Sequence, residues 1–154
     1  MQRTQTVPHP RREVFAFFAD AANLERITPP FLGFQILTPR PIAIRAGTLI
    51  DYRIRLHGIP LTWQTRIEHY IPEDHFVDVQ LRGPYRTWRH LHEFVVVPGG
   101  TEIRDTVDYE LPLGPLGSLA HALFVKRQLA TIFDYRRRII TELFGPGEAQ
   151  RAVR

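Results

Sequence analysis

The sequence predicts a single α+β domain in which a curved antiparallel sheet of about six to seven strands wraps around one long C-terminal helix. Between residues 34 and 111, apolar and polar side chains alternate with a period of two in segments separated by turn-forming residues, as in half-buried strands. Residues 118–144 instead repeat apolar side chains at helical spacing. The apolar face of a sheet and that of a helix are best buried against each other, and the curvature of such a sheet favours a cavity between them.

A short edge strand at residues 3–8 and two short helices open the predicted fold. The first helix is expected to begin near Pro10, because proline is favoured at the first turn of a helix. The second is expected over residues 23–28, with Asn23 as its N-cap. Two prolines then prevent a regular helix, so the apolar residues 31–32 either fill the core or flank the mouth of a cavity.

The central strands follow from the period-two alternation. In the strand expected at residues 76–81, Val77, Val79 and Leu81 are predicted to face inward. The reverse assignment, which would turn Gln80 toward the interior, stays open. The other strands are expected at residues 34–37, 48–56, around 63–67, and in the two halves of segment 83–111, which join at a Pro-Gly-Gly turn.

The last predicted element is a helix from a candidate N-cap at Ser118 to about Phe144, where Gly145 ends it. The domain is therefore expected to span residues 1–146, followed by a frayed tail at residues 147–154. The arginine run 136–138 is expected on the solvated face of this helix. Its apolar stripe consists of Val125, Leu129, Ile132, Ile139 and Leu143, with Phe124 and Phe133 alongside.

Composition excludes several classes of function. The chain has no cysteine, so disulfides, thiolate nucleophiles and thiolate metal sites are excluded. The formal net charge of +4 invites a nucleic-acid partner, but the arginines are scattered rather than gathered in a stripe among aromatic residues, so none is predicted. A signal peptide and a membrane-spanning apolar run are both missing from the sequence, which makes the cytoplasm the expected location.

The strongest functional signal is a group of polar residues in segment 83–111. His90 and His92 share a strand face with the apolar Phe94, and Asp105 interrupts the apolar set of the next strand. Both faces are expected to be buried, and buried polar groups cost free energy unless they are partnered. The group therefore predicts a buried network, a set of ligand anchors, or a catalytic site.

Each interpretation of His90, His92 and Asp105 makes a different chemical claim. As catalytic groups, the histidines would transfer protons while Asp105 sets their tautomer or pKa. As anchors, all three would hydrogen-bond the polar atoms of an apolar ligand. As a structural network, they would satisfy one another. A His-x-His pair with Asp105 also fits a metal site, but this spacing is common, so no metal and no other cofactor is predicted.

The order of elements and several segments resemble the START-like (SRPBCC, Bet v 1-type) helix-grip superfamily. The resemblance extends from Arg3 to Phe144 and lies closest to its bacterial ligand-binding branch, near polyketide cyclase/dehydrase and CoxG-like proteins. The segments that carry it are VFAFFADAANLERITPP, GTLIDYRIRLHGIPLTW, RGPYRTWRHLHEF, GGTEIRDTVDYELPLGPLG and IFDYRR. The resemblance implies an internal cavity, between sheet and long helix, that binds an apolar or aromatic small molecule. It implies no fixed catalytic set.

The leading hypothesis is therefore a protein, monomeric or homodimeric, that binds a hydrophobic or aromatic molecule of lipid or polyketide type. The alternative is a polyketide cyclase or dehydratase in which His90 and His92, with Asp105, act as acid and base. A third hypothesis is an interaction module, in which the convex face of the sheet or the loop at residues 31–32 docks a partner or a membrane. The residues expected to bind the ligand are Tyr52, Trp63, Gln80, Tyr85, Trp88, His90, His92, Asp105, Phe124 and Phe133.

Overall fold

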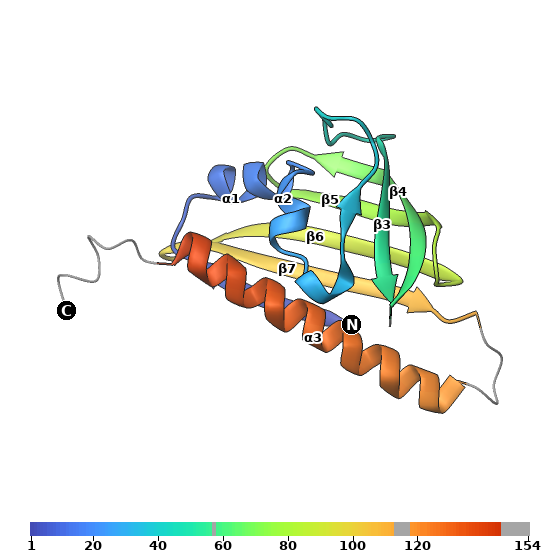
Figure 1. Cartoon of the computed structure of the whole chain (residues 1–154). Helices are drawn as coiled ribbons and strands as arrows, with labels where there is room; N and C mark the ends of the chain where they lie inside the picture. Colours follow the sequence, from blue (N-terminus) through green and yellow to red (C-terminus); the bar gives the residue numbers. More distant parts are fainter. Residues whose placement is uncertain (57, 113–117, 146–154) are drawn as a thin grey trace.

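The computed structural model describes residues 1–56, 58–112 and 118–145, which form one seven-stranded antiparallel sheet and its covering helices (Figure 1). This confirms the predicted α+β class and the helix-grip arrangement of sheet and C-terminal helix. From one edge to the other, the strands are β1 (Gln2–Val7), β7 (Gly100–Glu110), β6 (Thr87–Val97), β5 (His75–Arg82), β4 (Ile59–Ile71), β3 (Leu49–Leu56) and β2 (Gln35–Ile36).

Two short helices and a 3-10 turn connect β1 to β2: α1 (Arg11–Phe18), α2 (Asn23–Arg26) and η1 (Pro30–Leu32). Asn23 is not the N-cap of α2 but its first residue, and its side-chain amide donates to the carbonyl of Phe17. No side chain caps α2 in this part of the structure.

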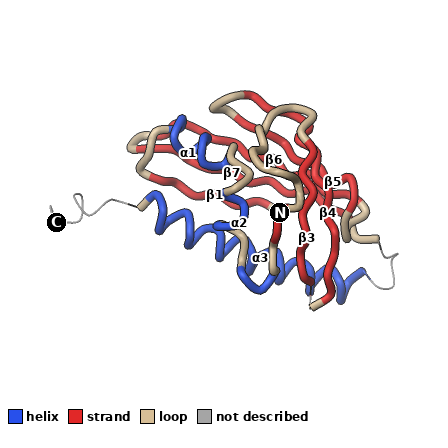
Figure 2. The backbone as a smooth tube through the Cα atoms, turned by 45° about the horizontal axis from the view of Figure 1, so that its top comes forward, coloured by secondary structure: helices blue, strands red, loops and turns tan. Residues whose placement is uncertain are grey.

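The long helix α3 (Ser118–Phe144) runs along the side of the sheet, beneath α1, α2 and η1 (Figures 1 and 2). None of the helices within the described ranges is long and apolar enough to cross a membrane. The predicted stripe of α3 is partly correct: Leu129 and Phe133 are buried, but Leu143 is 38% exposed. Ile140 and Phe144 take its place in the core. The expected tail at residues 147–154 lies outside the described residues.

A dense hydrophobic core closes one end of the space between sheet and helix. Aromatic rings of α1 meet those of the sheet there, for example Phe15 and Phe94, whose ring centroids are 5.3 Å apart. Because this end is filled, the space that remains lies toward η1 and the first half of α3. The buried members of the core are Val7, Val14, Phe15, Phe18, Ile27, Phe76, Phe94, Ile103, Ile140 and Phe144.

The inward face of β5 is the reverse of the preferred prediction. Phe76 is buried and Asp78 lines the interior, whereas Leu81 is 48% exposed. The physical reason is the pairing with β6, in which Phe76 lies opposite His92 and Asp78 opposite His90. Residues directly opposite one another in an antiparallel pair point to the same side of the sheet, so the inward histidines bring Phe76 and Asp78 with them.

Candidate functional site

A cavity of about 200 Å³ lies between the inner face of the sheet, the segment from α1 to η1, and α3. Its lining is mostly apolar, which matches the usual makeup of small-molecule pockets. Seven of the ten residues expected to bind a ligand line it: Tyr52, Trp63, Tyr85, Trp88, His90, His92 and Phe133.

The other three expected residues lie outside this lining. The Gln80 side chain is used structurally, because its amide donates to the carbonyl of Tyr85 over 2.8 Å. Asp105 lies behind the histidines and reaches the cavity only through them. Phe124 is 49% exposed and borders an outer groove on α3, so it is not a wall of the inner cavity.

One part of the cavity wall is a cluster of aromatic rings. Tyr52 stacks on Trp63 at 5.8 Å between centroids, and the edge of Trp63 meets Trp88 at 5.4 Å. Tyr85 lies 4.8 Å from Trp88. Flat, rigid walls of this kind favour aromatic ligands, since offset-stacked and edge-to-face ring pairs stabilise a contact beyond the area that they bury.

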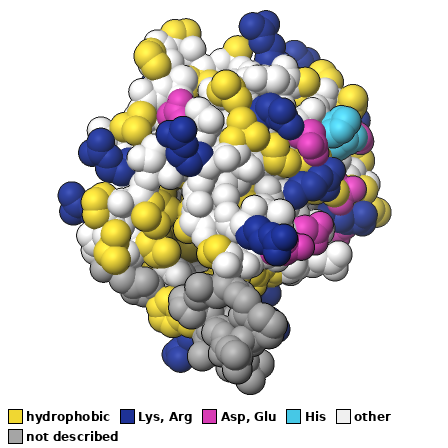
Figure 3. Space-filling model, turned by 90° about the vertical axis from the view of Figure 1, so that its right-hand side faces the viewer, with side chains coloured by type: hydrophobic (Ala, Val, Ile, Leu, Met, Phe, Trp, Pro, Cys, Tyr) yellow, Lys and Arg dark blue, Asp and Glu magenta, His cyan; other side chains and the backbone are white. Residues whose placement is uncertain are grey.

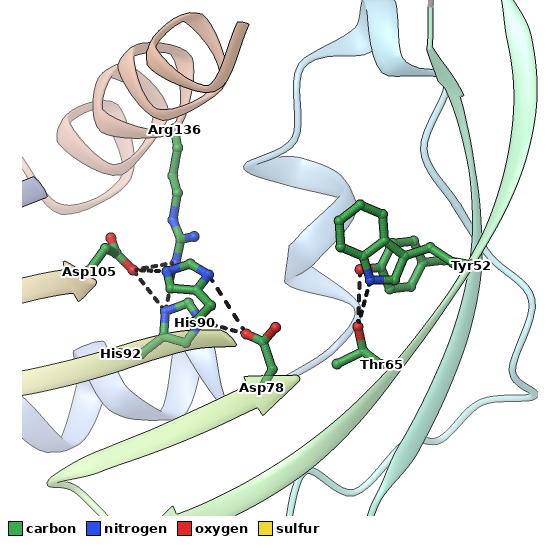
Figure 4. A network of polar contacts seen from close by, with 8 residues as sticks. Tyr52, Thr65, Asp78, His90, His92, Asp105 and Arg136 are labelled. Atoms are coloured by element: carbon green, nitrogen blue, oxygen red, sulfur yellow. Dashed lines mark hydrogen bonds and ion pairs between the residues drawn. The ribbon is translucent and has the colours of Figure 1, made fainter. Parts of the chain in front are cut away.

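A small group of hydrogen-bonded polar atoms interrupts the aromatic wall. The hydroxyl oxygens of Tyr52 and Thr65 are 3.1 Å apart, and the Trp63 indole N–H donates to the same Thr65 oxygen over 3.1 Å (Figure 4). Burial raises the pKa of Tyr52 well above its ordinary value, so its hydroxyl keeps its proton and is a donor as well as an acceptor.

The opposite part of the wall holds two adjacent imidazoles, tilted by 38° to one another, between two carboxylates. The rings of His90 and His92 are 3.7 Å apart, and both are buried (Figure 4). Asp105 Oδ1 lies 2.9 Å from His90 Nε2 and 2.8 Å from His92 Nδ1. Asp78 Oδ2 lies 3.0 Å from His92 Nε2. The strand alternation that brings the histidines to one face therefore also brings each within reach of a carboxylate.

Arg136 completes this network from α3. Its Nη2 atom lies 3.5 Å from Asp105 Oδ1 and 3.3 Å from His92 Nδ1, and its guanidinium lies over the ring of Phe18 at 4.9 Å. Only 11% of its side chain is exposed, so the expectation of a solvated face is wrong for this residue of the arginine run. Arg137 and Arg138 are exposed.

The charges of the network follow from its geometry. Burial would disfavour a charged His92, but its hydrogen bonds to Asp105 and Asp78 outweigh burial and raise its pKa. Burial and the neighbouring charge of His92 lower the pKa of His90 to about 4. Against the effect of burial, Arg136 and the two histidines hold the pKa of Asp105 well below its usual range.

Asp78 behaves like Asp105. Burial would raise its pKa, but the hydrogen bond from His92 and the nearby positive charges lower it. When His92 is protonated, as its raised pKa favours, the network holds two carboxylates against two cations, His92 and Arg136, with His90 neutral. Its net charge is zero, which is how a buried set of charges avoids a large desolvation cost.

Sequence reasoning missed Asp78 and Arg136 as members of this site. The signal for Asp78 is the register of β5 on β6, which a single sequence does not specify. The signal for Arg136 was present in the sequence, because Leu129, Phe133, Arg136 and Ile140 follow one another at intervals of three or four residues, on one side of the helix. A charged residue at a core position of this pattern indicates a buried partner.

A metal ion fits this group poorly. One donor atom each from Asp78, His90 and His92 lies within 4.8 Å of the others, which a metal could bridge. Ligand imidazoles must be unprotonated, however, and both ring nitrogens of His92 face a carboxylate, which favours its protonated form, while the cation Arg136 lies beside it. Asp78 Oδ2 and both ring nitrogens of His92 already have partners among the residues present.

The comparison with protein-family models decides the family. The model described as polyketide cyclase/dehydrase and lipid transport matches residues 7–133, from the end of β1 to the middle of α3. The chain belongs to the polyketide cyclase/dehydrase and lipid transport family. This confirms the resemblance seen in the sequence segments. No curated protein sequence matches the chain.

Solved structures similar to this family member share its fold. The Zhui aromatase/cyclase from Streptomyces sp. R1128 is 17% identical, with a TM-score of 0.64 and 96% of each chain covered. Protein CV1439 from Chromobacterium violaceum is 12% identical, with a TM-score of 0.69, 95% of this chain covered and 96% of the other.

A third similar structure is a much longer protein. The nucleoside-diphosphate sugar epimerase from Corynebacterium glutamicum is 26% identical over 92% of this chain, with a TM-score of 0.66. The match covers only 28% of the epimerase chain.

Proposed function

We propose that this protein binds a hydrophobic, preferably aromatic, small molecule of polyketide or lipid type in the cavity between the sheet and α3. The observation that carries the proposal is the composition of the cavity wall. Apolar and aromatic side chains form most of it, while polar groups converge at two places, the His90–Asp78–Arg136 side and the Tyr52–Thr65 pair. A mostly apolar pocket with a few placed polar groups is the usual form of a ligand site.

The size of the cavity limits the part of the ligand that it holds. An apolar cavity of about 150 Å³ accommodates benzene. At about 200 Å³, the cavity suits a ring system on the order of one to two fused rings. A ligand with oxygen atoms at both ends of that ring system would contact Thr65 and Tyr52 at one end and His90 at the other.

A cavity-filling variant tests this proposal. Native mass spectrometry of the purified protein identifies any molecule that co-purifies, and calorimetric titration with 2-naphthol measures binding directly. Ile54 is buried on β3 and lines the cavity, so the indole of Ile54→Trp should occupy the ligand's space and weaken 2-naphthol binding by at least about tenfold. Leu49→Trp, at an exposed position on the same strand, is the matched control and should bind normally. Undiminished binding by a folded Ile54→Trp would place the ligand elsewhere.

A second candidate function, proton transfer in a cyclase or dehydratase reaction, is favoured by the tautomer of His90. The Nε2–H of neutral His90 donates to Asp105, which leaves Nδ1, 3.7 Å from Asp78 Oδ2, as an acceptor on a residue that lines the cavity. Such an imidazole can remove a proton next to a ligand carbonyl, while Asp105 stabilises the imidazolium formed. With a pKa of about 4 it is a weak base, which is why binding is the first proposal.

Proton transfer can be tested with a two-ring ketone. Hydrogen–deuterium exchange at the α-carbon of 2-tetralone in D₂O, followed by NMR, reports abstraction without requiring the natural substrate. Exchange above background that disappears in His90→Gln, while 2-tetralone still binds, is the expected result for an acid–base role. Exchange equal to the buffer rate at saturating protein would restrict the function to binding.

A further inference from the structure

An outer groove adjoins the ligand cavity between η1, the end of β3 and the first half of α3. Phe31 and Phe124 form its apolar part and are 57% and 49% exposed. Gln128 lines both the groove and the inner cavity, so the two spaces meet at this residue. Adjacent residues of the chain also line the two spaces. Phe31 borders the groove and Leu32 the inner cavity, and Arg55 and Leu56 are divided in the same way. The groove therefore lies at the mouth of the cavity.

Among the described residues, the charged groups that line this groove are two arginines. Arg55 and Arg127 line it, no acidic residue does so within the described ranges, and neither arginine forms an ion pair there. The Arg55 side chain is exposed and lies beside Gly33, the residue that follows η1. At the end of the molecule where α3 begins, Lys and Arg side chains are mixed with hydrophobic ones, and most of the acidic ones lie to one side (Figure 3).

The inner cavity is a poor place for a negative group. Asp78 lines it as a carboxylate, and the positive charges nearest to it, on His92 and Arg136, are already balanced by Asp78 and Asp105. A second anion inside would be desolvated next to Asp78 without a free cation. An anionic ligand would therefore be bound with its charge at the mouth and its apolar body inside.

We propose that the natural ligand is an amphipathic anion whose ring or chain fills the cavity while its carboxylate or phosphate is bound by Arg55 and Arg127 at the groove. The proposal rests on the function proposed above and adds the chemical class of the ligand. The guanidinium group suits both kinds of anion, because its fork of N–H donors matches two oxygens. Phe31 and Phe124 would cover the linker between the apolar body and the charged group.

Two probes that differ only in charge test this assignment. 4-(2-Naphthyl)butanoate and 4-(2-naphthyl)butan-1-ol carry the same ring and linker, and calorimetry at low salt gives both dissociation constants. We expect the carboxylate to bind about five times more tightly than the alcohol, because two exposed ion pairs contribute modestly. In the double variant Arg55→Gln/Arg127→Gln, the carboxylate should bind no more tightly than the alcohol, whose own affinity should be unchanged. Added NaCl should reduce the advantage in the unaltered protein as well.

The control variant is Arg12→Gln, an exposed arginine on α1 away from the groove, which should keep the advantage. Equal affinities of the two probes, or an advantage that survives in the double variant, would overturn the role of the arginines and leave the proposed binding function intact. Failure of both probes to bind would overturn both proposals. A membrane surface is the other possible partner of the groove. If the protein sedimented with phosphatidylglycerol vesicles only when both arginines were present, and bound the carboxylate probe no more tightly than the alcohol, the groove would be a membrane-binding surface and the inference would be overturned.

Discussion

Asp105→Asn is expected to destabilise the fold by about 3–5 kcal/mol, the usual cost of removing one partner from a buried set of charges. The Asp105 side chain is 9% exposed, and its Oδ1 atom contacts His90, His92 and Arg136 within 3.5 Å. The amide of asparagine has nearly the same shape but carries no charge. Arg136 and the imidazolium of His92 would then be left with Asp78 as their only carboxylate in this network.

The measurement is the free energy of unfolding from urea or guanidinium titrations at neutral pH. Asp108→Asn is the matched control, since Asp108 is on the same strand with its side chain exposed. A surface substitution of this kind changes stability by less than about 0.5 kcal/mol. If the two variants were equally stable, the charges around Asp105 would contribute nothing to the fold.

The stability of the protein is expected to rise by up to about 3 kcal/mol between pH 4 and pH 6.5 because of His90. Burial lowers the pKa of this imidazole from 6.5 to about 4 in the folded protein. Within that window the unfolded chain binds a proton at this position and the folded protein does not, so raising the pH favours folding. The full contribution is present above pH 6.5 and is lost as the pH falls through 4.

The other members of the network act outside this window. His92 has a raised pKa, so its contribution is present below pH 6.5 and is lost as the pH rises through its folded-state value. Asp78 and Asp105 have lowered pKa values, so their contribution is lost only below the ordinary value of 3.8. Stability should therefore pass through a maximum near pH 6.5, with His90 setting the acid side and His92 the alkaline side.

Thermal unfolding of His90→Gln across pH 4 to 8 checks this assignment. Glutamine can still donate to Asp105 but does not titrate, so the rise between pH 4 and pH 6.5 should disappear while the fall at higher pH remains. His69→Gln, at an exposed position on β4, is the matched control and should retain both sides of the profile. A rise that persists in His90→Gln would mean that another group titrates in this range.

The sequence by itself determined the fold class and the main position of the polar cluster. Alternation of period two requires His90 and His92 to share a face whichever strands pair with theirs, and the apolar neighbours of that face show that it is buried. Asp105 is identified in the same way from the strand that follows. Local periodicity is sufficient for these assignments because a strand or a helix has the same geometry wherever it lies.

The tertiary structure alone decided the partners of these residues and the limits of the cavity. Asp78 faces inward because β5 pairs with β6 in one particular register, although the alternating apolar side chains of this strand, Val77, Val79 and Leu81, lie on its other face. Arg136 reaches Asp105 because α3 packs across the sheet, whereas Phe124, three turns earlier and about 120° around the axis of that helix, borders the outer groove beyond the cavity. Which charges meet, and which aromatic rings enclose the ligand, are set by contacts between elements far apart in the chain, and no local pattern encodes those contacts.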